Sequence, residues 1–426
     1  MSNIILSNQS FWSWLAPQKN KNGNTIESCL RHFGDNQLDK DYIIALRKNT
    51  PPNSSSLMNK LAVSVPRMYF LELQFCAMVY GKIFSQVFPP LAAHVDQLTY
   101  IEWLLYVEPE NMKYRDHLVH MFKVAFVGDQ LFEDKKFLEK VVELQFNSPH
   151  FKDWQQAKKF SVVGSDKETI IKMAFFLTSI FHDFGYGYFL LRKYNDKVSK
   201  INEWLMPPSD FLDFNSPFAQ IIFESLPASF IETRHEWLGK NGQNKDYFRN
   251  KSISGFFRDC LPLNHSIASC FFILDIAEKL RKARALKSSL YIAFQLAAEA
   301  AMIHDMTDNK RWMHLYQEKN ACHFLDQKTQ ESVPLAMLLI LADELSIWNR
   351  PRIESRVEYN GVRHSMKVPK NTNIKLSLNE NTLQITSTPK EWVREINSKL
   401  NKMEFLKSQD EEEIIEVLGY KVNLNV

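Results

Sequence analysis

His182 and Asp183 stand side by side at the end of an apolar run, and this pair constrains the fold more than any other feature of the sequence. Residues 165–182 carry apolar side chains at helical spacing, which predicts a helix that ends at the pair. Gly185 then supplies a C-terminal break. A carboxylate buried at the end of such a helix is costly unless a partner such as a metal ion compensates its charge. We therefore expect other segments to bring ligands to this point.

Four further ligand-type residues each lie on a separate apolar segment with helical spacing. They are His120 in 111–128, His265 in 262–284, His304 in 288–304 and Asp343 in 332–348. Neutral imidazoles and carboxylates hold divalent Zn, Mn, Fe or Mg at hydrolytic sites. A lone histidine on an apolar helix is more often a core or surface residue, so the argument depends on the whole set. Helices packed in a bundle can direct such side chains to one point.

Composition favours a mainly helical protein, because only 12 of the 426 residues are glycine and apolar runs are long. The five cysteines are scattered without a Cys-x-x-Cys pair, which fits a reducing cytoplasm better than a disulfide framework or a zinc ribbon. We see neither a signal peptide nor a membrane span, and we expect a cytoplasmic protein. The net charge of +3 gives no general reason to expect nucleic acid as a partner. A local basic groove that binds a single strand remains an alternative.

The sequence divides into three regions. Residues 1–60 are mostly polar and are interpreted as irregular. Residues 61–356 form the helical domain, interrupted by an aromatic and proline-containing insertion at 190–260 that is a candidate substrate-selecting element. Residues 357–426 are interpreted as a small α/β appendage.

Local signals set the expected boundaries inside these regions. Asn111 is a candidate N-cap for the helix that carries His120, and Gly128 is either its stop or a close-packing point. Residues 374–378 and 382–386 alternate apolar and polar side chains around a short polar turn, which predicts a hairpin. Two helices are expected to follow, the last beginning near Ser408 and ending at Gly419.

The ordered pattern His120, His182-Asp183, His265, His304 and Asp343 resembles the HD-domain superfamily of metal-dependent phosphohydrolases, over roughly residues 100–350. The stretches 115–128 and 341–348 look like uncharacterised bacterial members of that superfamily. The resemblance implies an HD-type helical bundle that binds one or two divalent ions, with Mn, Mg, Zn, Fe and Ni not distinguished.

By the same resemblance, one ion would be held by His120, His182, Asp183 and Asp343. A second ion would be held by His265 and His304, with Asp183 bridging. The implied reaction is hydrolysis of a nucleotide or another phosphate ester by a metal-bound hydroxide, with Asp183 as a catalytic residue. The pattern does not separate a phosphomonoesterase from a phosphodiesterase.

Several neighbours of these residues are candidates for other roles. His117 is a candidate general acid, an alternative ligand to His120, or a residue with neither role. Asp305 is a candidate for orienting an imidazole. The candidate phosphate contacts are Arg115, Lys123, Arg350 and Arg352. Tyr186 and Tyr188 are candidates for stacking on a base or for core packing.

Two other functions remain open at this point. A similar six-ligand arrangement serves the di-iron oxygenases of the superfamily, which cleave C–C or C–P bonds with O₂. The third hypothesis is a non-catalytic nucleotide-sensing protein, and the complete ligand set argues against it. The expected partner is a small phosphate ester or nucleotide, and a homo-oligomer stays open. The appendage could dimerise, bind a regulator or cover a sheet edge.

Overall fold

A computed structural model describes residues 2–20, 22–25, 73, 75–83, 85, 113–115, 117–148, 151–152, 155, 161–162, 164–186, 265–282, 288–305, 333–346, 352–358, 361–367, 373–388, 391–400 and 415–425. Over these residues the chain is mainly helical with a small sheet that is largely C-terminal, as the sequence predicts. The predicted insertion at 190–260 lies outside the described residues. None of the described helices is both long and apolar enough to cross a lipid bilayer.

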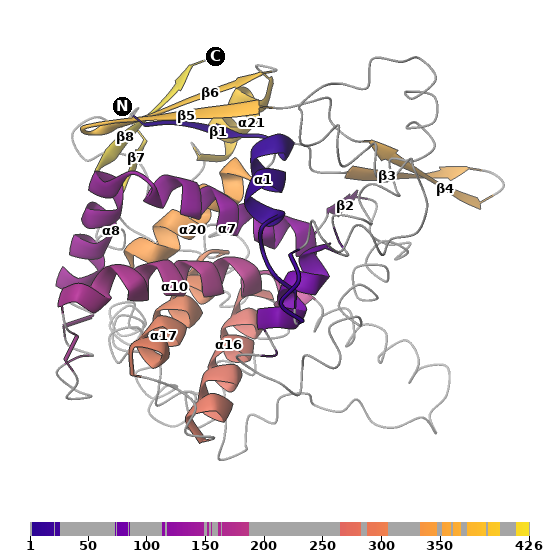
Figure 1. The fold of residues 1–426 in the computed structure, drawn as a ribbon. Coiled ribbons are helices and arrows are strands. Elements are labelled where there is room, and N and C mark those ends of the chain that lie inside the picture. The colour runs from indigo at the N-terminus through magenta and orange to yellow at the C-terminus, as the bar shows by residue number, and fades with distance from the viewer. Residues whose placement is uncertain are drawn as a thin grey trace, which may run out of the picture.

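Six helices build the layer that carries the ligand-type residues. They are α7 (Leu118–Phe132), α8 (Lys135–Asn147), α10 (Lys167–Phe181), α16 (His265–Lys282), α17 (Ser288–Ile303) and α20 (Pro334–Leu345). α10 packs against α7 and α17, and α17 also packs against α16 and α20. Nearly every residue of α7 and α20 is buried, as expected for helices that are apolar on all sides. In Figure 1, α16 and α17 lie below α10, and the sheet lies on the opposite side of the layer.

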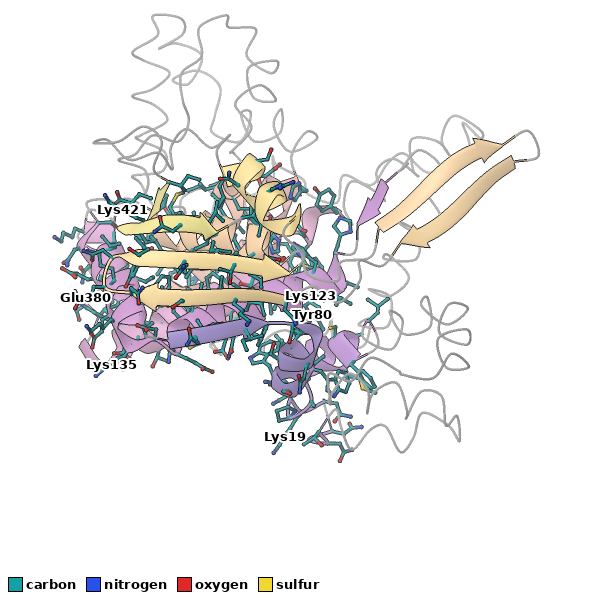
Figure 2. All side chains as sticks on the ribbon, turned by 90° about the horizontal axis from the view of Figure 1, so that it is seen from above. Lys19, Tyr80, Lys123, Lys135, Glu380 and Lys421 are labelled. Atoms are coloured by element: carbon teal, nitrogen blue, oxygen red, sulfur yellow. The ribbon has the colours of Figure 1, made fainter. Side chains whose placement is uncertain are left out.

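A five-stranded sheet covers the helical layer, with the strand order β1-β5-β6-β8-β7. β5 (Asn373–Asn379) and β6 (Thr382–Thr388) form the predicted antiparallel hairpin. Ile374, Leu376 and Leu378 are buried on one face of β5, whereas Lys375 on the other face is exposed. Figure 2 shows the sheet from above, with the helices beneath it.

The N-terminal residues are not irregular, and the interpretation of residues 1–60 is wrong for the first fifteen. β1 (Ser2–Leu6) pairs antiparallel with β5 along the sheet edge, and α1 (Asn8–Leu15) follows. Ser7 and Ser10 form a reciprocal capping box at the start of α1. β1 is too short to show a clear alternation by itself, and the strand that it pairs with is at the other end of the sequence.

The predicted start of the helix that carries His120 is also wrong. α7 begins at Leu118, and β2 (Lys113–Arg115) precedes it, which excludes Asn111 as its N-cap. β2 joins β3 (Arg352–Glu358) and β4 (Gly361–Lys367) in a separate three-stranded sheet. The pairing of β2 with β3 is long-range, so no local pattern indicated it. Gly128 does not end α7 either and is instead a close-packing point, because a Cβ there would collide with the ring of Phe175.

The predicted C-terminal helix ending at Gly419 is wrong from residue 415 onward, and its expected start at Ser408 lies outside the described residues. β7 (Glu416–Val417) turns into β8 (Tyr420–Asn425), and β8 then pairs parallel with β6. Leu418 and Gly419 have φ values of 57° and 80°, as in a two-residue hairpin turn. Gly419 fits a helix stop equally well, which made the sequence signal ambiguous. The other expected helix is present as α21 (Glu391–Leu400).

Candidate metal centre

The six ligand-type residues of the sequence pattern come together at one place. They are His120 near the start of α7, His182 and Asp183 directly after α10, His265 at the start of α16, His304 directly after α17, and Asp343 in the last turn of α20. Two groups of three could each hold a metal ion: His120 with His182 and Asp183, and Asp183 with His265 and His304. The convergence that the sequence predicts is therefore confirmed for the described residues.

Asp183 lies at the centre of the cluster and is shared by both groups. Its Oδ1 atom is 3.3 Å from His265 Nε2, 3.5 Å from His182 Nε2 and 3.7 Å from His304 Nε2. Its Oδ2 atom is 3.9 Å from His120 Nε2. One carboxylate thus faces all four imidazoles, each through the same ring nitrogen.

Asp343 supplies the second carboxylate and lies nearer to the surface. Its Oδ1 atom is 2.5 Å from His120 Nε2 and 3.8 Å from His182 Nε2. The side chain of Asp343 is 31% exposed and that of Asp305 is 22% exposed, whereas that of Asp183 is only 9% exposed. Asp343 and Asp305 are therefore the more exposed carboxylates at the cluster.

The opposite nitrogens of two imidazoles are fixed by backbone carbonyls. His182 Nδ1 is 2.7 Å from the carbonyl oxygen of Ser179, and His304 Nδ1 is 2.5 Å from that of Ala301. A carbonyl oxygen only accepts, so Nδ1 carries the hydrogen in both rings. In the neutral rings the Nε2 lone pairs then point at the centre, which is the orientation of a metal-ligating histidine.

Ser346 fixes the orientation of His120, and the sequence analysis did not identify it. The Ser346 hydroxyl donates to the backbone carbonyl of Asp343 at 2.8 Å, and its oxygen lies 2.8 Å from His120 Nδ1. Because its single hydrogen is already used, the hydroxyl accepts from Nδ1–H, and His120 also directs Nε2 inward. The only available signal was a serine three residues after Asp343 at the helix end, a pattern that is common in helix caps.

The electrostatics of the cluster keep both carboxylates ionised. Burial alone would raise the pKa of Asp183, but the imidazoles of His182, His265 and His304 outweigh it and hold that pKa well below its usual range. The pKa of Asp343 is likewise held well below its usual range, because His120 and His182 outweigh the effect of burial.

Two of the imidazoles respond in opposite directions to this environment. Burial lowers the pKa of His265, which favours the neutral ring that a metal requires. Burial would also lower the pKa of His182, but the charges of Asp183 and Asp343 reverse the effect and raise it.

The donor set fits a divalent cation. Carboxylate oxygens and imidazole lone pairs all point to the same space, and His182 Nε2 is a buried atom with no hydrogen-bond partner. Two ligands about 2.05 Å from a tetrahedral ion are separated by about 3.3 Å, a spacing close to the distances around Asp183 Oδ1. Imidazole and carboxylate ligands suit Zn, Mn, Fe or Ni, so the ion is not identified by the donors alone.

The remaining candidate residues lie at different distances from the centre. The ring of Tyr186 stacks on that of His265 at 4.0 Å, and the ring of His117 lies 4.5 Å from that of Tyr186. Asp305 Oδ2 is 3.5 Å from His265 Nδ1, which agrees with its expected role beside an imidazole. Lys123, one turn after His120, is only 1% exposed. One face of Tyr186 is thus already covered by a ring of the protein.

Other candidates are placed only in part. Arg115 is the last residue of β2, and Arg352 is the first residue of β3, where the two are paired in register. Arg350 and Tyr188 lie outside the described residues.

Comparison with protein-family models, with curated proteins and with solved structures gives no match for this chain.

Proposed function

We propose that this protein is a metal-dependent phosphohydrolase of the HD type, acting on a nucleotide or another phosphate ester. The observation that carries the proposal is the orientation of three imidazoles. The Nδ1 atoms of His182 and His304 donate to backbone carbonyls and that of His120 lies beside the Ser346 hydroxyl, so the Nε2 atoms of all three face the carboxylates of Asp183 and Asp343. A proton or a cation has to lie between each Nε2 atom and the carboxylates, and one or two divalent ions would fill that role for all of the ligands at once.

The residues divide into two overlapping sets. His120, His182, Asp183 and Asp343 would hold one ion, and Asp183, His265 and His304 would hold a second. Bound divalent ions supply a Lewis acid that lowers the pKa of water and neutralises phosphoryl oxygens. Asp183 orients the attacking water by accepting its hydrogen bond, because this carboxylate is common to both sets.

We expect the phosphate ester to approach the cluster past its more exposed carboxylates. Asp343 and Asp305 are the more exposed carboxylates there, so an anionic substrate needs compensating positive charge. Arg115 is a candidate for that charge, since it lies two residues before His117 in the sequence. During hydrolysis the water oxygen would bond to phosphorus and pass a proton to Asp183, while the bond to the leaving oxygen breaks. His117, next to Tyr186, donates a proton to that leaving oxygen.

The test combines metal analysis with a substrate screen. The protein is purified, loaded with Mn²⁺ or Mg²⁺, and assayed against nucleoside mono-, di- and triphosphates and against phosphodiesters. We expect turnover by the wild type, and loss of turnover in His182→Ala, because this imidazole is completely buried among the ligands.

Asp129→Asn is the matched control. Asp129 lies in α7 like His120, but its carboxylate accepts from the indole of Trp14 and takes no part in the cluster. Equal turnover by wild type and His182→Ala would exclude the assigned site. Bound iron with oxygen uptake, and no phosphate release, would favour the oxygenase chemistry instead.

A further inference from the structure

Tyr186 forms part of a stack of three rings at the edge of the candidate metal centre. Its ring lies nearly parallel to the imidazole of His265, with 4.0 Å between centroids and 16° between planes. The ring of His117 lies 4.5 Å from Tyr186 at an angle of 53°. The three residues come from three segments: the residue before α7, the turn after α10 and the start of α16.

His265 is held differently from the other three imidazoles. The Nδ1 atoms of His120, His182 and His304 each have an oxygen within 2.5–2.8 Å. The Nδ1 atom of His265 instead has the Asp305 carboxylate at 3.5 Å, which is too long for a firm hydrogen bond. A contact at that distance attracts the ring but does not fix its plane, so the orientation of this imidazole depends on its Nε2 contacts and on the ring stacked against it.

We propose that Tyr186 is the positioning residue for His265, holding its imidazole in the plane that points Nε2 at Asp183. Nε2 of His265 lies 3.3 Å from Asp183 Oδ1, so a rotation of the ring would remove it from the group formed with His304. This inference rests on the proposed metal centre and adds that one of its two ion sites depends on a stacked aromatic ring.

The stack also favours the ion-bound form of His265. An imidazole that donates its lone pair to a cation becomes electron-poor, and an aromatic face is attracted to such a ring. The flat contact needs an aromatic ring at position 186 and does not need the phenol hydroxyl. Residues that orient a metal-ligating histidine change the affinity for metal by about 10–100-fold when they are removed.

Co²⁺ titration of the metal-free full-length protein tests the inference, because Co²⁺ absorption reports the geometry of each ion and binding is measured without catalysis. We expect the wild type to bind two ions. Tyr186→Leu should bind the ion at Asp183, His265 and His304 at least about tenfold more weakly. The ion at His120, His182 and Asp343 should bind with unchanged affinity. Tyr186→Phe should keep both ions, because it retains the ring.

Phe272→Leu is the matched control, because Phe272 lies on α16, as His265 does, and its ring stacks at 4.4 Å on the ring of Phe184, which is not one of the ligands. It should bind both ions, and thermal unfolding of all three variants should confirm that they are folded. Two ions bound equally tightly by Tyr186→Leu would overturn the role of Tyr186 and leave the metal centre standing. A wild type that binds no Co²⁺ would overturn the proposed function, and the inference with it. Loss of both ions in Tyr186→Leu would show a general structural role and would also overturn it.

Discussion

The Nε2 atoms of His265 and His304 lie 3.3 Å apart in the interior of the protein. His304 donates from Nδ1 to the carbonyl of Ala301, so its Nε2 carries a lone pair when the ring is neutral. His265 has the Asp305 carboxylate beside Nδ1, which favours the same tautomer. Two lone pairs at this distance repel each other unless a proton or a cation lies between them. A cation also explains why the carboxylate of Asp183 faces the same point.

Replacement of Asp183 provides the first test of this interpretation. Asp183→Asn keeps the shape of the side chain but removes the charge shared by both groups of ligands. We expect both ions to be lost, with a fall in affinity larger than the about 10–100-fold typical of a residue that only orients a ligand. Elemental analysis after gel filtration measures the number of ions bound to each protein.

The control for Asp183→Asn is the same substitution at an aspartate outside the cluster. Asp129→Asn removes an exposed carboxylate of α7 that bonds to Trp14 and should leave the metal content unchanged. Chelation should lower the thermal midpoint of the wild type and of Asp129→Asn, because an ion that binds only the folded state stabilises it. A chelator effect of equal size in Asp183→Asn would show that the ion binds elsewhere.

Ser346 provides a second and narrower prediction. Ser346→Ala removes the hydroxyl that accepts from His120 Nδ1, so the imidazole loses its fixed tautomer and orientation. We expect about 10–100-fold weaker binding of the ion at His120, measured by calorimetric titration. Ser179→Ala is the control, because His182 bonds to the backbone carbonyl of Ser179 and not to its hydroxyl. An equal loss in both variants would indicate damage to the helices and not to the ligand.

The sequence predicted the helices and the ligands because both depend on local signals. Apolar residues at helical spacing identified most of α10, α17 and α20, and each of these helices ends at or near a ligand. Alternating side chains likewise identified the hairpin of β5 and β6. The convergence of the ligands was predicted from ligand chemistry together with the resemblance of their order to the HD-domain pattern, since a shared cation accommodates several imidazoles and carboxylates at one point.

Long-range pairing produced the parts that the sequence did not predict. β1 is five residues long and is stabilised by β5, while β2 is three residues long and pairs with β3. Neither segment carries a pattern strong enough to identify it as a strand alone. Ser346 and the stacking of Tyr186 were missed for a related reason. Their roles depend on distances to His120 and His265 that sequence spacing does not contain.

The close approach of α7 and α10 at Gly128 leads to a prediction about stability. A Cβ at Gly128 would overlap the buried ring of Phe175, so Gly128→Ala should destabilise the protein by about 1–3 kcal/mol despite the higher helix propensity of alanine. Urea unfolding measures the difference. Gly164→Ala is the control, because a Cβ there meets nothing within 4 Å. Adding Phe175→Leu to Gly128→Ala should recover part of the loss. Full stability in Gly128→Ala alone would mean that the helices separate easily.

The buried carboxyl of Glu299 should make the free energy of unfolding depend on pH, independently of metal binding. Burial in α17 raises the pKa of its carboxyl from 4.5 to about 8. The folded protein therefore keeps this proton over a pH range in which the unfolded chain has lost it. The resulting stabilisation is complete below pH 4.5 and is lost as the pH rises to about 8. At about 1.4 kcal/mol per pKa unit, the loss is on the order of a few kcal/mol.

Glu299→Gln should remove this dependence, because the amide stays neutral at every pH. We expect the free energy of unfolding in urea to fall less steeply from pH 5 to pH 8 in Glu299→Gln than in the wild type, so the variant gains relative stability as the pH rises. Titration of the His/Asp cluster contributes to both proteins, and the difference between the two curves isolates Glu299. Glu139→Gln, which alters an exposed carboxylate paired with Lys135, should follow the wild-type curve. Parallel curves for wild type and Glu299→Gln would mean that the buried carboxyl is ionised throughout, with a cationic partner in the folded protein.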